Sequence, residues 1–171
     1  MSAYSKSVEA ASEAFTYTSI MIPALLLAAP QEDWVSIGSM YAGSLLLSWG
    51  LKELGKTLVV RKRPYMYFDR YPQTEVECGD YLESFPSGHA ALAFTGASFF
   101  SFVFSQYCVD SPWKIPLIGA SFACATAASA LRVGSGNHFP SDVVVGSAIG
   151  AFSGFIIPWL RSLYENGKGK R

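Results

Sequence analysis

Five long apolar runs, separated by polar links, limit the folds open to this chain. They cover about residues 10–29, 34–60, 90–107, 113–131 and 141–164. Each run is close to the ~20 residues that an α-helix needs to cross the hydrocarbon core of a bilayer. Backbone polar groups inside a bilayer must be bonded within the protein, which favours helices for runs of this length. We therefore predict an all-α, multi-pass membrane bundle of about five transmembrane helices.

Composition supports a membrane bundle and argues against several other classes of protein. Charged residues make up 15% of the 171 positions, against about 25% in typical domains, and the mean hydropathy is +0.25. The net charge is zero, which gives no electrostatic basis for binding nucleic acid. The three cysteines show no CxxC spacing, so we expect neither a disulfide framework nor a metal site, and no cofactor. The length predicts one domain over residues 1–171. A soluble bundle of very apolar helices is the alternative.

Three local features refine this prediction. Pro23 should kink the first helix, which neighbouring helices can tolerate in a membrane. Gly146, Gly150 and Gly154 recur every four residues and favour close helix packing. The longest polar break, residues 65–85, is rich in aromatic and acidic residues. It either shapes the entry of a substrate or is a solvated connector.

Three polar segments lie at the ends of the predicted helices. They are residues 56–64 (KTLVVRKRP), 86–89 (PSGH) and 132–142 (RVGSGNHFPSD). If the helices cross the membrane alternately, all three segments meet at one membrane face. Ionisable residues at the edge of a membrane bundle are functional candidates by default. We therefore predict one active site at that face.

Both histidines of the chain fall in these segments. His138 and Asp142 are four residues apart at a helix start, which places them on one face about 5–6 Å apart between Cβ atoms. A neutral imidazole can attack phosphorus when an acceptor holds its other nitrogen and fixes the tautomer. His89 is then available to protonate the leaving oxygen.

Cations and a helix start complete the predicted site. Arg63 and Arg132 can grip phosphoryl oxygens bidentately, and Lys56 adds a compact charge. Lys56 lies seven residues before Arg63, which predicts a shared helix face. Arg61 and Lys62 are interpreted as interfacial charges.

Ser87 and Gly88 begin the third predicted helix. Backbone N–H groups at a helix start, together with the helix dipole, favour phosphate binding. The three segments together therefore indicate phosphoryl transfer.

The three segments resemble the signature of the type 2 phosphatidic acid phosphatase superfamily, which includes lipid phosphate phosphatases and vanadate haloperoxidases. That signature is K-x6-RP, then PSGH, then SR-x5-H-x3-D. The matching positions are, in order, Lys56, Arg63 and Pro64, then residues 86–89, then Arg132, His138 and Asp142. The resemblance spans about half of the chain, and three separate motifs in order make it specific.

The resemblance implies a helical bundle, catalysis without a metal and a phosphohistidine intermediate. By resemblance, His138 is the nucleophile, Asp142 its partner and His89 the general acid. The residues implied to bind phosphate are Lys56, Arg63, Ser87, Gly88 and Arg132. The family also implies an integral membrane location, here the inner membrane of a bacterium, with the site facing the periplasm or exterior.

Two features depart from the family pattern. Leu131 stands where the family has a serine before the arginine, so one hydroxyl contact to phosphate is missing or supplied elsewhere. Integral-membrane members usually have six helices, and the sixth would precede residue 1. Basic residues occur at both predicted faces, so the positive-inside rule does not orient the chain.

We predict a membrane lipid phosphatase that acts on a phosphomonoester or pyrophosphate. Candidate substrates are phosphatidic acid, phosphatidylglycerophosphate, undecaprenyl pyrophosphate and a phosphorylated lipid A. One alternative is an inactive relative that binds or flips phospholipids. Others are a membrane phosphatase of a soluble sugar phosphate and a soluble haloperoxidase or acid phosphatase. The expected partners are the lipid substrate and membrane lipids, and the sequence leaves the oligomeric state open.

Overall fold

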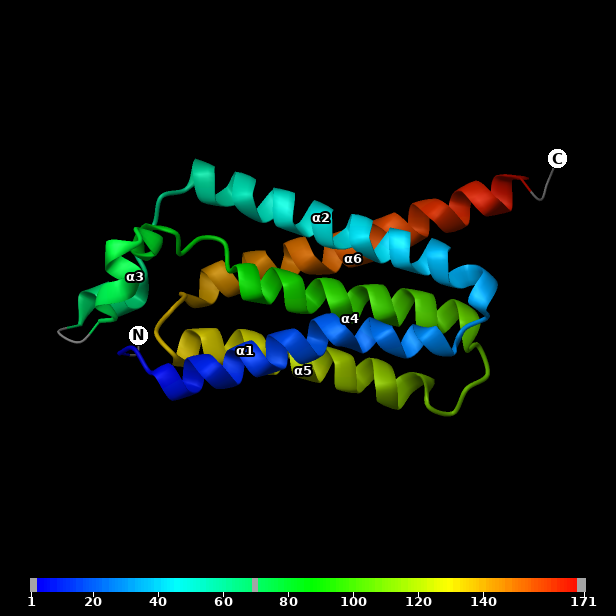
Figure 1. The fold of residues 1–171 in the computed structure, drawn as a ribbon, viewed down its shortest axis with the longest axis horizontal. Coiled ribbons are helices and arrows are strands. Elements are labelled where there is room, and N and C mark those ends of the chain that lie inside the picture. Colours follow the sequence, from blue (N-terminus) through cyan, green and yellow to red (C-terminus); the bar gives the residue numbers. More distant parts are fainter. Residues whose placement is uncertain (1–2, 69–70, 169–171) are drawn as a thin grey trace.

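The computed structural model describes residues 3–68 and 71–168, most of which are helical (Figure 1). The five long helices predicted from the apolar runs are present. Their bounds are Lys6–Met21 (α1), Trp34–Leu58 (α2), Gly88–Tyr107 (α4), Lys114–Gly134 (α5) and Pro140–Lys168 (α6). After Met21 the chain continues as a 3-10 helix, η1 (Ile22–Ala28), because Pro23 lacks the N–H that an α-helix uses. A second 3-10 turn, η2 (Gln31–Asp33), leads into α2.

Helix α4 is the centre of the bundle, and α1, α2, α5 and α6 all pack against it. Its small and aromatic residues form the core, with Ala93, Ala97, Phe99 and Phe100 fully buried. The outer surfaces of the other helices expose large apolar side chains such as Ile115, which is 83% exposed. This arrangement suits an apolar solvent around the bundle.

Three glycines of α6 (Gly146, Gly150 and Gly154) bring its backbone directly against the backbone of α4. A Cβ atom at any of them would lie 2.1–2.4 Å from a carbonyl oxygen of α4. The carbonyl oxygens belong to Ser87, Ala91 and Thr95. The predicted packing role of this glycine stripe is confirmed, and the contact at Ser87 ties the first turn of α4 to the first turns of α6.

Four helical segments are long and apolar enough to cross a membrane. They are Lys6–Ala28, Gly88–Tyr107, Lys114–Gly134 and Pro140–Gly167. Helix α2 has 25 residues but falls outside this group, and its last turns carry Lys52, Glu53 and Lys56. The fold is the all-α membrane bundle that the sequence predicts.

The predicted polar segments meet at one end of the bundle (Figure 1). The end of α2, the start of α4, the end of α5 and the start of α6 all lie there, beside the N-terminus of α1. The segment between α2 and α4 covers this end. It contains three short helices, η3 (Pro64–Tyr67), α3 (Gln73–Glu77) and η4 (Asp80–Leu82).

The prediction that Lys56 and Arg63 share a helix face is wrong. Helix α2 ends at Leu58, and Arg63 has φ −69° and ψ 152°, in the extended region. Pro64 restricts the residue before it to extended conformations, so the helix cannot continue through Arg63. The extended segment instead pairs with the chain before α4 through a single parallel bridge between Arg61 and Glu83.

Candidate active site

A cavity of about 300 Å³ lies at this end of the bundle. Its walls come from α1, α2, the segment between α2 and α4, and the ends of α4 and α5 that meet there. The lining residues are Glu9, Glu13, Lys52, Lys56, Arg63, Asp80, Gly88, His89, Leu92, Arg132 and His138. Both histidines and four cations therefore face one space, although their positions span more than eighty residues of the sequence.

Six of the eight residues predicted for the site line this cavity. They are Lys56, Arg63, Gly88, His89, Arg132 and His138. Ser87 and Asp142 are fully buried behind its wall. The Ser87 hydroxyl accepts the Ala90 N–H at 3.5 Å and caps α4, and the Ser87 N–H donates to the Asp142 carbonyl oxygen at 3.0 Å. Ser87 therefore joins the starts of α4 and α6.

His138 is 3% exposed, and one of its ring nitrogens is held by the backbone. Nδ1 lies 2.7 Å from the carbonyl oxygen of Ser84, which makes Nδ1–H the donor and leaves Nε2 as the basic nitrogen. The sequence interpretation made Asp142 the direct partner of this ring. In the structure the Asp142 carboxylate is 3.9 Å from Nδ1, too far for a hydrogen bond.

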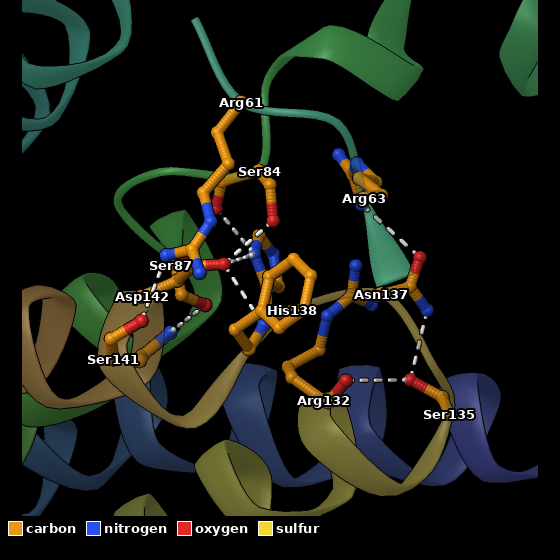
Figure 2. A network of polar contacts seen from close by, with 12 residues as sticks. Arg61, Arg63, Ser84, Ser87, Arg132, Ser135, Asn137, His138, Ser141 and Asp142 are labelled. Carbon is orange, nitrogen blue, oxygen red and sulfur yellow. Dashed lines mark hydrogen bonds and ion pairs between the residues drawn. The ribbon is translucent and has the colours of Figure 1, made fainter. Parts of the chain in front are cut away.

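The Asp142 carboxylate instead binds groups that surround His138. It accepts hydrogen bonds from Arg61 Nη1 at 2.6 Å, the Ser84 hydroxyl at 2.6 Å and the Phe139 N–H at 2.9 Å. Figure 2 shows the His138 ring between this carboxylate and the Arg132 guanidinium. Through Ser84, the carboxylate fixes the residue whose carbonyl oxygen fixes the tautomer of His138.

The prediction that Arg61 is an interfacial charge is wrong, because its guanidinium binds groups of the site. Besides Asp142, its guanidinium contacts the Ser141 hydroxyl at 2.8 Å and lies 4.1 Å from the centre of the Phe139 ring. Its carbonyl oxygen accepts the Ser84 N–H at 3.0 Å. Alternate residues of an extended segment point to the same side, so the spacing of Arg61 and Arg63 was a signal for this placement.

The cavity cations are each paired with a carboxylate. Lys52 contacts Glu53, Lys56 Nζ lies 2.7 Å from Glu83, and Arg63 Nη2 lies 2.5 Å from Asp80. Arg63 also donates to the Asn137 amide oxygen at 3.1 Å, a contact that the sequence did not indicate. These partners hold the cations around the cavity.

Arg132 differs from the other cavity cations. Its Nη1 lies 3.3 Å from a carboxylate oxygen of Glu9, and the residue is 2% exposed. Its Nε–H is buried and has no hydrogen-bond partner among the described residues. A buried donor without a partner is costly, so this edge of the guanidinium favours an anionic ligand.

Burial and the nearby charges of Arg63 and Arg132 hold the pKa of His138 well below its usual range. Burial is the largest cause, because removal from water disfavours the charged ring. The ring is therefore neutral near pH 7, and only the neutral ring carries a lone pair on Nε2. The cavity thus combines a neutral imidazole with fixed positive charges.

The sequence of this chain is similar to those of known proteins. The sequence matches the PAP2 superfamily over residues 37–164. Lipid A 1-phosphatase from Rhizobium etli is 31% identical over 118 residues, which cover 68% of this chain and 47% of that protein. Undecaprenyl-diphosphatase from Sulfolobus acidocaldarius is 29% identical over 140 residues, or 82% of this chain and 62% of that protein. The chain spans about half the length of the first of these relatives.

A solved structure has the same fold. The crystal structure of Aquifex aeolicus LpxE superposes with a TM-score of 0.62 at 23% identity, covering 91% of this chain and 87% of that one. With the four apolar spans, this likeness makes the chain an integral membrane protein. The superfamily match covers three quarters of the chain and every predicted site residue, from Lys56 to Asp142, and the chain belongs to the PAP2 superfamily.

Proposed function

We propose that this chain carries the active site of a metal-independent membrane lipid phosphatase. The observation that carries the proposal is one cavity lined by two histidines and four cations at the end of a membrane bundle. Phosphoryl transfer needs a nucleophile, a proton donor and neutralisation of the phosphoryl oxygens. The names of the relatives, a lipid A 1-phosphatase and an undecaprenyl-diphosphatase, support the same class of reaction.

In the first step, Nε2 of His138 attacks the phosphorus atom and a P–N bond forms. The bond from phosphorus to the leaving oxygen breaks, and His89, which the negative charge of the bound phosphate keeps protonated, gives that oxygen its proton. Arg63, Arg132 and Lys56 neutralise the phosphoryl oxygens, and the Gly88 N–H at the start of α4 adds a backbone donor. The hydrogen bond from Nδ1 to Ser84 stabilises the positive charge that develops on the ring.

In the second step, water attacks the phosphohistidine. His89, now neutral, takes a proton from the water, the P–N bond breaks, and its electron pair returns to Nε2. Inorganic phosphate leaves and both histidines regain their starting protonation. Asp142 takes part in both steps by holding Ser84 and, through it, the tautomer of His138.

The substrate is a lipid whose phosphate reaches the end of the bundle while its hydrocarbon chains stay in the bilayer. Phosphatidic acid, phosphatidylglycerophosphate, undecaprenyl pyrophosphate and a lipid A phosphate all meet this description. We place the protein in the inner membrane of a bacterium with the cavity facing the periplasm or exterior, as the family resemblance implies. Residues 1–171 act as one domain in this proposal.

Release of inorganic phosphate by detergent-purified protein tests the proposal. We expect the wild type to release phosphate from at least one of these four lipids in excess EDTA, and H138A to release none. Circular dichroism of H138A should match the wild type. Activity lost in EDTA and restored by a divalent cation, or activity retained by H138A, would contradict the mechanism. No release from any lipid by folded protein would favour a binding role.

A further inference from the structure

Glu13 is a carboxylate in the catalytic cavity that the proposed mechanism does not use. It lies on α1, within the membrane-spanning segment Lys6–Ala28, and is partly buried. Of the carboxylates lining the cavity, Glu9 contacts Arg132 and Asp80 contacts Arg63. Glu13 has no ion pair or hydrogen bond among the described residues. Ionisable side chains inside membrane spans are costly and mark functional sites.

The direction and packing of α1 and α4 place Glu13 beside the start of α4. Helices α1 and α4 both begin at the site end and run the same way (Figure 1). At 1.5 Å per residue, Glu13 lies about 6 Å further into the bundle than Glu9, and Leu92 about 4.5 Å further than His89. Gly96 of α4 lies against the backbone of Ser19 of α1, so six residues earlier on both helices Glu13 is level with the first turn of α4, beside His89, and Leu92 lies deeper.

The Arg132 Nε–H, which has no hydrogen-bond partner among the described residues, marks where the phosphate end of a substrate would bind. In the proposed mechanism that edge, with His138 in the same cavity, takes the phosphate. The leaving oxygen meets His89, the first group beyond it meets Glu13 at the same level of the bundle, and the rest of the leaving group runs inward past Leu92. The first group beyond the ester oxygen thus meets a hydrogen-bond acceptor, and the next meets an apolar side chain.

We propose that Glu13 selects substrates with a hydrogen-bond donor on the carbon next to the phosphate-bearing carbon. The inference rests on the proposed function and deepens it by naming the substrate class. A free hydroxyl of a glycerol headgroup or an amide N–H of an acylated amino sugar supplies such a donor. A fully acylated glycerol or a prenyl chain does not, and leaves the Glu13 carboxylate without a partner.

Two matched lipids test this inference. One is 1-acylglycerol 3-phosphate, with a free hydroxyl at carbon 2, and the other is its 2-O-methyl ether, which lacks only the donor. We expect wild-type kcat/KM to favour the hydroxyl lipid about tenfold, as for a hydrogen bond to a charged group. In E13A that preference should fall to near unity, mainly through slower hydrolysis of the hydroxyl lipid. E13Q, which keeps an acceptor oxygen, should retain part of it.

E32A is the matched control, because Glu32 lies in η2 at the opposite end of the bundle and is exposed. It should keep the wild-type preference. Equal wild-type rates on both lipids, or an unchanged preference in E13A, would overturn the role of Glu13 while leaving the phosphatase intact. No phosphate release from either lipid by folded wild-type protein would overturn the proposed function and this inference with it.

Discussion

Two polar regions lie side by side at one end of this bundle, and they differ in how their groups are satisfied. The positioning cluster (Arg61, Ser84 and Asp142) is bonded within itself, and its Asp142 carboxylate accepts three hydrogen bonds at 2.6–2.9 Å. The candidate cavity keeps a buried donor of Arg132 without a hydrogen-bond partner, and a Glu13 carboxylate that forms no ion pair within 4 Å, among the residues that the structure describes. The first region is built to stay fixed, and the second is built to receive a ligand.

The largest effect is expected from removing the carboxylate of the positioning cluster. D142A should lower kcat about 10³-fold, less than the ~10⁴-fold known for a carboxylate bonded directly to its catalytic histidine. It should also lower the free energy of unfolding by about 1–3 kcal/mol, because it leaves the buried Ser84 hydroxyl and the Phe139 N–H without their acceptor. S84A removes the hydroxyl through which Asp142 holds this residue, so it should lose a large part of the same activity, while Asp142 keeps its contacts to Arg61 and Phe139. A wild-type kcat in S84A would contradict the link through Ser84.

Changing the cavity should weaken binding without destabilising the fold. R132K removes the Nε–H and the planar fork but keeps a charge, and we expect kcat/KM to fall about 10–100-fold. Inhibition by vanadate, which mimics pentacoordinate phosphorus, should weaken by a similar factor. The melting temperature should change by less than it does in D142A. A melting temperature that falls as far as in D142A would remove the contrast between the two regions.

Arg61 should act on turnover rather than on binding, since it touches Asp142 and not the cavity. R61Q should lower kcat about tenfold with little change in KM, because one charged hydrogen bond to Asp142 is lost. R61K should recover part of the loss. K62Q, an exposed neighbour, should match the wild type. A raised KM in R61Q would instead place Arg61 among the phosphate-binding residues.

The smallest expected effect is a pH dependence of stability from His138. Its pKa is lower in the folded than in the unfolded chain, so the folded state stays neutral where the unfolded state binds a proton. Its contribution is fully present above pH ~6.5 and is lost as the pH falls toward the folded pKa, by at most about 1.4 kcal/mol per pH unit. Unfolding of H138N in detergent should show a shallower acid slope than the wild type. Parallel slopes would contradict the assignment.

The helices and the convergence of their ends could be predicted from the sequence because both follow from run length and alternating crossings. The positioning cluster could not be predicted in the same way. The group that holds His138 is the backbone carbonyl of Ser84. Every residue has such a carbonyl, so the residue types do not reveal which one makes this contact. Asp142 could be found by its spacing, but its actual partners come from distant segments.

The cavity was predictable only where a motif marked it. Glu9 and Glu13 lie on a helix without a signature, and only the packing of α1 against α4 and α5 brings them to the site. Leu131, at the position of the family serine, is partly buried on α5 and is absent from the described cavity lining. This departure from the family pattern therefore falls outside the described wall of the cavity.

The glycine stripe between α4 and α6 has a consequence for how the protein fits membranes of different thickness. Helices accommodate a thicker or thinner bilayer by changing their tilt. Since α4 and α6 touch backbone to backbone, they must tilt as one body, with His89 and His138 at the same end of it. Helix α1 makes the same kind of contact with α4, where Gly96 lies against the backbone of Ser19, so it tilts with them. Helix α2 meets α6 at Gly43 only through the Ile157 side chain. A change of lipid length would thus move the lysines of α2 at the cavity wall before it alters the spacing of the two histidines.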